Sequence, residues 1–147
     1  MQQKEVIEVK IVNRSHHPLP EYKTSGSVGM DLCANLDNPV LLMKGDTAVI
    51  PTGLYIQMPS GWEAQVRQRS GLSMKGIVAE LGTIDSDYRG QIGIILHNQG
   101  HDAFRVEDGM RLAQLVFNRV TIALLEEVDS LDEDTERGTG GFGSTGV

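Results

Sequence analysis

The chain has 147 residues and a mass of 16.1 kDa, a length that suits one domain with a single core. Its net charge of −7 argues against nucleic-acid binding, which needs a basic face. The single cysteine, Cys33, excludes an internal disulfide and a cysteine-based metal site. No apolar run approaches the roughly 20 residues of a membrane span, and no signal peptide is visible, so we expect a cytoplasmic protein without membrane partners.

Short apolar segments alternate with turn residues along most of the chain, which is typical of strands. Period-2 alternation predicts the first strand at 7–11. Two pairs of apolar segments, 40–43 with 47–50 and 53–58 with 62–67, flank glycine-containing turns and predict two hairpins. One helical turn is expected near 70–75, and further strands are expected at 77–79, 91–97, 104–107, 111–117 and 122–128. The pattern predicts an all-β sandwich or barrel, preferably a jelly roll.

The composition changes towards the C-terminus, which predicts three parts. Residues 1–128 carry the strand pattern and form the predicted jelly-roll core. Residues 129–136 are rich in aspartate and glutamate, as a solvated linker would be. Residues 137–147 form a glycine-rich arm that cannot bury enough surface to order itself and should be flexible.

The arm carries groups suited to a nucleotide. Glycine-rich backbone can direct N–H groups at phosphate oxygens, and Arg137 can form charge-assisted bonds to them. Phe142 offers a flat face on which a nucleobase can stack. The alternative is a disordered low-complexity tail without a role.

A second polar segment, 82–90, lies at a strand junction. It contains Asp85, which can accept a proton from water, and Tyr88, whose ring can pack against a sugar. A polar turn built for its geometry is the alternative. Gly93, inside the next predicted strand, indicates close approach by a ligand or by another backbone.

Three further places hold candidate residues. Arg69, Ser70 and Gly71 open the predicted helical turn, where they suit a phosphate, although Ser70 as an ordinary N-cap explains them equally well. Asp31 can orient metal-bound water or cap a turn. Gln114 interrupts an apolar run and needs polar partners. The four histidines show no metal-ligand spacing and are interpreted as surface residues.

Together and in this order, these segments resemble the trimeric dUTPases, the deoxyuridine triphosphate nucleotidohydrolases, over nearly the whole chain. The five matching motifs are Gly29-Met30-Asp31-Leu32, Arg69-Ser70-Gly71-Leu72, the segment 82–90, the segment 109–115 and the segment 137–146. The resemblance implies a homotrimer whose active sites are each built from all three subunits. It implies hydrolysis of dUTP to dUMP and pyrophosphate with Mg²⁺ held mainly by the triphosphate.

The resemblance also assigns roles to residues. Asp85 would be the base that activates the attacking water, Gln114 would help to place that water, and Asp31 would contact Mg²⁺ through water. Tyr88 would pack under the deoxyribose and exclude ribose, and Arg111 would pair with a buried carboxylate. The implied substrate-binding residues are Arg69, Ser70 and Gly71 for phosphates, Gly82, Thr83, Ile84 and Gly93 for the uracil edge, and Arg137, Phe142, Gly143, Ser144 and Thr145 in the arm.

One segment departs from the family pattern. Many members carry an asparagine near the tip of the hairpin that reads uracil and a longer loop before it, whereas 76–81 here is shorter and has no asparagine. Uracil would then be read by backbone groups, or Glu80 would take part of the role. Two alternatives stay open: a dCTP deaminase on a similar fold, and a non-catalytic trimeric nucleotide-binding protein.

Overall fold

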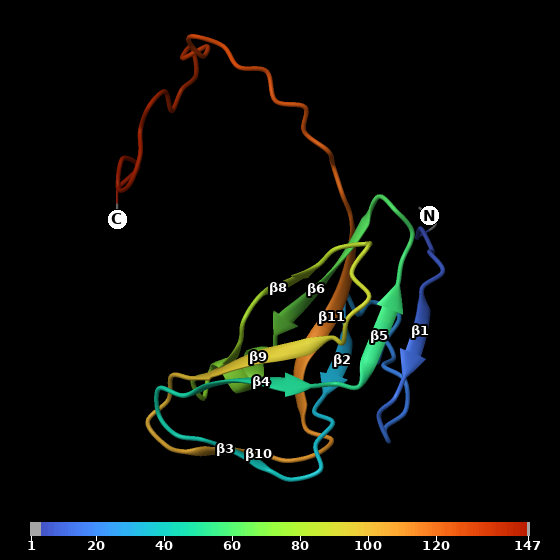
Figure 1. Ribbon diagram of the computed structural model, residues 1–147. Coiled ribbons are helices and arrows are strands. Elements are labelled where there is room, and N and C mark those ends of the chain that lie inside the picture. Colours follow the sequence, from blue (N-terminus) through green and yellow to red (C-terminus); the bar gives the residue numbers. More distant parts are fainter. Residues whose placement is uncertain (1–3, 147) are drawn as a thin grey trace.

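The computed structural model describes residues 4–146 (Figure 1). Residues 1–3 and 147, the outer ends of the predicted core and arm, lie outside the described part. Within it there are eleven strands and one four-residue helix, so the predicted all-β class is confirmed. No helix between residues 4 and 146 is long and apolar enough to cross a membrane.

The strands form four antiparallel sheets. The largest has the order β2 (Met30–Cys33), β11 (Arg111–Arg119), β6 (Trp62–Gln68) and β8 (Gly82–Ile84). The second has the order β4 (Thr47–Pro51), β9 (Gly93–Asn98) and β7 (Ile77–Ala79). Two strand pairs complete the fold, β1 (Lys10–Asn13) with β5 (Leu54–Gln57) and β3 (Val40–Leu42) with β10 (Phe104–Val106). The short helix α1 (Ser70–Ser73) connects β6 to β7, and so links two sheets.

The core is made of alternate side chains from these strands. Leu32, Ile50, Ile94 and Leu96 are completely buried, as the period-2 pattern predicts. Asn98 is buried among them, and its amide donates to the carbonyl oxygens of Leu42 and Asp102 at 2.9 Å. The polar group is therefore satisfied, and it fixes the chain around the end of β9.

Neither predicted hairpin forms. β3 pairs with β10 while β4 pairs with β9, and β5 pairs with β1 while β6 pairs with β11 and β8. The turns do reverse the chain, with Gly45 and Gly61 at positive φ. However, each turn delivers the second strand to a different sheet, because burial of its apolar face there decides its partner.

The predicted strand at 122–128 also does not form. β11 ends at Arg119, and the tail from 120 to 146 runs away from the body without helix or strand (Figure 1). Ile122 and Leu124 are 86% and 98% exposed. A strand needs a neighbouring edge for its backbone hydrogen bonds, and no sheet edge of the described chain lies beside this segment.

Candidate active site

One cluster of charged side chains is centred on Asp31 in β2. Its Oδ1 lies 3.4 Å from Arg69 Nε, and its Oδ2 lies 3.5 Å from Arg111 Nη1. Arg69 Nη1 also donates to the Arg111 carbonyl at 2.8 Å. Asp31 is therefore the carboxylate that pairs with Arg111, as the resemblance implies. Its side chain is about one-quarter exposed, so this partner is half-buried and not fully buried. The arrangement holds two guanidinium groups side by side at the surface, where they suit an anion.

Gln114 lies beside Asp31 on the same face of the sheet. Asp31 pairs with Gln114 across β2 and β11, and Gln114 pairs with Arg67 of β6. The Gln114 amide donates to the Gln68 carbonyl at 3.1 Å, so its predicted need for a polar partner is met. Gly29 makes room for it, because a Cβ there would lie 2.5 Å from Gln114 Oε1. The first, second and fourth motifs therefore meet at one end of the sheet.

Ser70 is the first residue of α1 and is exposed, as is Gly71. The N-cap is Arg69, in extended conformation, and no side chain caps the helix. The alternative of an N-cap at Ser70 is therefore wrong. The Ser70 hydroxyl and the Gly71 backbone lie next to Arg69, with space around Gly71 for a ligand.

Asp85 and Tyr88 lie together in the turn after β8. The Tyr88 N–H donates to the Asp85 carbonyl at 3.1 Å, and Tyr88 Oη donates to the Gln91 carbonyl at 2.9 Å. Gly90 is required here, because a Cβ would lie 2.3 Å from Tyr88 Oη. Asp85 is exposed and Tyr88 is 45% exposed, so both are available to a ligand.

The segment 79–82, next to the residues expected to read uracil, connects two sheets. β7 pairs with β9 and β8 pairs with β6, so only Glu80 and Leu81 span the gap between Ala79 and Gly82. The Glu80 carboxylate accepts from His97 Nε2 at 2.8 Å and is thereby engaged with β9. In this conformation, backbone groups of residues 82–84 rather than Glu80 remain as candidates to read a base.

Packing against β4 explains why position 93 is a glycine. It pairs with Pro51 of β4, and a Cβ on it would lie 2.8 Å from Val49 Cγ1. In the single chain, the close approach is thus made by a neighbouring side chain.

The structure separates Asp85 from the Asp31 cluster. Asp85 lies one residue beyond Ile84, which pairs with Ala64, whereas the row of Asp31 and Gln114 crosses β6 at Arg67. At the usual spacings, this corresponds to about 13 Å along the strands, and three strand steps across the sheet add about 14 Å. Asp85 and Gln114 of one chain therefore do not meet at one water molecule.

The arm is a third separate part. Arg137 Nε donates to the Gly140 carbonyl at 2.9 Å, and Phe142 is completely exposed. The hydrogen bonds of residues 137–146 stay within this segment, apart from one from the Gly138 N–H to Thr135 Oγ1 at 2.9 Å. The remaining arm candidates, Gly143, Ser144 and Thr145, are exposed as well.

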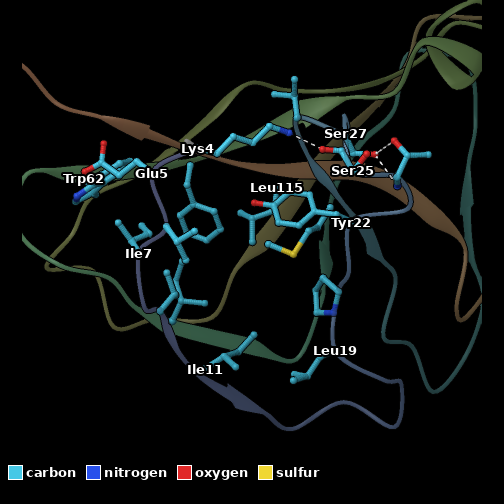
Figure 2. A pocket seen from close by; sticks show the side chains of 18 residues that line it. Lys4, Glu5, Ile7, Ile11, Leu19, Tyr22, Ser25, Ser27, Trp62 and Leu115 are labelled. Atoms are coloured by element: carbon cyan, nitrogen blue, oxygen red, sulfur yellow. Dashed lines mark hydrogen bonds between the residues drawn. The ribbon is translucent and has the colours of Figure 1, made fainter. Parts of the chain in front are cut away.

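A cavity of about 560 Å³ is lined by none of the candidate site residues. Figure 2 shows its lining, which is mostly apolar and includes Ile7, Ile11, Tyr22 and Leu115. A smaller cavity of about 160 Å³ adjoins Asp31, Arg111 and Cys33. Burial raises the pKa of the Cys33 thiol, so this residue is a neutral wall of that cavity. The candidate site is thus the smaller, charged region.

Sequence reasoning missed one polar feature near the site. Arg67 Nε donates to Gln65 Oε1, and Gln65 Nε2 donates to Glu63 Oε1, both at 2.8 Å. The signal was present, because these residues alternate along β6 with the buried Ala64 and Val66. The same alternation that predicts the strand also places Glu63, Gln65 and Arg67 on one face of β6.

Comparison with known proteins identifies the family. The family model described as dUTPase matches residues 15–146. The curated deoxyuridine 5′-triphosphate nucleotidohydrolase of Roseobacter denitrificans is 52% identical over 133 residues, covering 88% of this chain and 87% of that protein. A Staphylococcus bacteriophage 80alpha dUTPase variant with dUpNHpp has a TM-score of 0.86 and 27% identity, covering 95% of this chain and 99% of that one. A dUTPase variant of the S. aureus phage phi11, described with a structural Mg(II) ion, shares the fold with a TM-score of 0.77. Its identity is 24%, and the match covers 85% of this chain and 99% of that one.

This all-β chain, with its family match and its relatives, is a nucleotide hydrolase. The chain belongs to the dUTPase family. The resemblance found in the five motifs is therefore confirmed, and so is the predicted enzyme class, dUTP diphosphatase.

Proposed function

We propose that the chain hydrolyses dUTP to dUMP and pyrophosphate by attack of water on the α-phosphate, limiting uracil in DNA and supplying dUMP. Membership in the dUTPase family, with every motif segment intact, carries this proposal. The arginine pair around Asp31 supports it, because guanidinium groups bind phosphate in a bidentate manner. Phosphoryl chemistry depends mainly on positioning and charge compensation, which these residues provide.

Asp85 acts as the general base and takes a proton from the attacking water, while Gln114 orients that water. The exposure of Asp85 after β8 and the anchoring of Gln114 by Gln68 support these roles. Tyr88 packs against the deoxyribose, where a 2′-hydroxyl would clash. Its hydroxyl is held by the Gln91 carbonyl, which fixes the ring for such shape discrimination.

The phosphates bind at Arg69, Ser70 and Gly71. The open space around Gly71 and the exposed Ser70 hydroxyl support this assignment. The backbone of Gly82, Thr83 and Ile84 reads the uracil edge. We keep Gly93 among the residues proposed to lie at the uracil edge. A side chain at this position would also disturb the packing of Val49.

The residues of the site fit a Mg²⁺ ion that is held mainly by the triphosphate of the substrate. Both carboxylate oxygens of Asp31 face guanidinium groups, so this residue suits a water-mediated contact better than direct coordination. When bound, Mg²⁺ offsets the charge of the triphosphate. Asp31 meanwhile keeps Arg69 and Arg111 in position for the phosphates.

The active enzyme is a homotrimer of jelly-roll subunits with shared sites. The separation of Asp85 from Gln114 within one chain supports sharing, since both groups must reach one water molecule. The exposed apolar tail residues Ile122 and Leu124 support association between copies. Sedimentation should give three times the 16.1 kDa chain mass, and a fully active monomer would refute the sharing.

The glycine-rich arm predicted at 137–147 closes over bound substrate. It follows the linker predicted at 129–136 and the core predicted at 1–128, whose last strand ends at Arg119. Arg137 contacts the γ-phosphate, Phe142 covers the uracil, and Gly143, Ser144 and Thr145 supply further polar contacts. The exposure of Phe142 and the absence of hydrogen bonds from 137–146 to the strands support a mobile clasp. Closure excludes water other than the nucleophile.

The cytoplasmic location of the protein also stays a prediction.

The test is pyrophosphate release with dUTP, dTTP, dCTP and UTP in the presence of Mg²⁺. We expect release from dUTP with strong preference over the other three nucleotides. Ammonia release from dCTP would instead indicate the deaminase alternative. Tight dUTP binding without turnover would indicate the non-catalytic alternative.

A further inference from the structure

Two adjacent histidines meet an aspartate next to the Asp31 region, because His17 lines the same small cavity as Asp31 and Arg111. His16 and His17 follow β1, and Asp108 lies in the turn between β10 and β11. His16 Nε2 is 2.5 Å from Asp108 Oδ2, and His17 Nε2 is 2.8 Å from Oδ1. One ligand atom from each residue lies within 4.8 Å of the other two, so three donors converge on one point.

The surrounding chain holds these donors in place. The Leu36 N–H donates to Asp108 Oδ1 at 2.9 Å, which orients the carboxylate. Asn13 Nδ2 donates to the His17 carbonyl at 2.8 Å, and the His17 N–H donates to Ser15 Oγ at 3.1 Å. Such outer contacts orient ligands in metal sites, and here they come from backbone and polar side chains on both loops.

Gly109 and the charge of Asp108 add to this arrangement. Gly109 has a φ of +80°, and a Cβ there would lie 3.3 Å from His17 Cε1, so glycine lets the ring lie close to the turn. The Leu36 N–H, with the two histidines, holds the pKa of Asp108 well below its ordinary range. The turn thus holds the His17 ring and the Asp108 carboxylate close together.

We propose that His16, His17 and Asp108 bind a divalent transition metal of the zinc class, with water completing the coordination. Imidazole nitrogen with one carboxylate oxygen is a donor set that zinc accepts, whereas Mg²⁺ prefers oxygen ligands. Zinc–ligand bonds of about 2.0–2.2 Å in a tetrahedral site separate donor atoms by about 3.3 Å. Each histidine nitrogen lies 2.5 or 2.8 Å from its Asp108 oxygen, so these two pairs need to move apart by less than about 1 Å. The His16 side chain is 57% exposed and free to do so.

The bound metal would join two distant parts of the chain. His17 and Asp108 are 91 residues apart, so the ion links the loop after β1 to the β10–β11 turn. Its role would be structural, because none of the residues assigned to the chemistry of dUTP hydrolysis is among its ligands. Zinc should therefore stabilise the fold by mass action without nucleotide.

The experiment titrates the full-length metal-free protein with Co²⁺ and Zn²⁺, without nucleotide. The variants are His16→Ala and Asp108→Asn, with His101→Ala as the matched control, because His101 is exposed and outside the cluster. We expect one Co²⁺ per chain with a visible absorption band that Zn²⁺ removes, and a higher Tm with Zn²⁺. Loss of an outer contact costs 10–100-fold in metal affinity, so loss of a ligand should cost at least about 100-fold.

The result that would overturn the proposal is equal Zn²⁺ affinity in the wild type and in His16→Ala. Such binding would lie elsewhere, for example at His97 and Glu80. Absence of stoichiometric Co²⁺ binding to the wild type would overturn it as well. If Asp108→Asn fails to fold, His16→Ala still decides, because His16 is exposed and its loss removes only one contact to Asp108. None of these measurements depends on dUTP turnover, so their failure is separate from failure of the proposed function.

Discussion

Removal of residues 137–147 is the perturbation that distinguishes a clasp from an inert tail. The arm makes no hydrogen bond to a strand among residues 4–146, and Phe142 is completely exposed. Its loss therefore removes no packing from the described core. The Tm and the oligomeric state should stay unchanged.

The effect on catalysis should be large, because the arm acts only with substrate bound. Stacking of Phe142 on a base is worth about 1–3 kcal/mol, and a charge-assisted contact from Arg137 adds about 1.5–3 kcal/mol. These contributions are not strictly additive, but about 2.7 kcal/mol corresponds to a hundredfold. We expect kcat/KM for dUTP to fall by at least about a hundredfold.

The assay compares kcat/KM and Tm of the full chain, the truncated chain and the single variant Phe142→Ala. Leu131→Ala is the control, since it removes another exposed apolar side chain from the linker before the arm. It should leave kcat/KM unchanged. A truncated enzyme with full activity would refute the clasp and return the arm to an inert tail.

Three further variants test the site. Asp85→Asn should lower kcat by about 10²–10⁴ with little change in Tm or dUTP binding, since it removes the general base; near-normal kcat would exclude that role. Tyr88→Ala should narrow the preference for dUTP over UTP, and an unchanged ratio of kcat/KM values would place sugar discrimination elsewhere. Gly29→Ala should lower the free energy of unfolding by about 1–3 kcal/mol and reduce turnover, because its Cβ would lie 2.5 Å from Gln114 Oε1. Gly26→Ala, with no atom within 4 Å of its Cβ, is the control and should match the wild type.

Much of the candidate site was readable from the sequence because chemistry and spacing are local properties. The motifs around Asp31, Arg69, Asp85, Gln114 and Arg137 follow one another in a fixed order that identifies the family. What the order does not contain is distance. Only the strand register revealed that Asp85 is remote from Gln114 in one chain.

The histidines illustrate the same limit. The sequence predicts surface positions for His16 and His17, because the histidines show no metal-ligand spacing. Their partner Asp108 is 91 residues away from His17 and reaches it through the packing of the β10–β11 turn. A cluster assembled across the fold leaves no periodic signal along the chain.

The sequence by itself indicated most of the strands, since alternation of apolar residues records burial of one face, but it did not predict β2 or β8. It determined the all-β class and the family. Only the tertiary structure decided which strands pair, because turn residues reverse the chain whereas buried apolar faces select the partner. The tail at 122–128 has the alternation of a strand but remains extended and unpaired, because a strand's backbone hydrogen bonds require an edge that one chain does not supply.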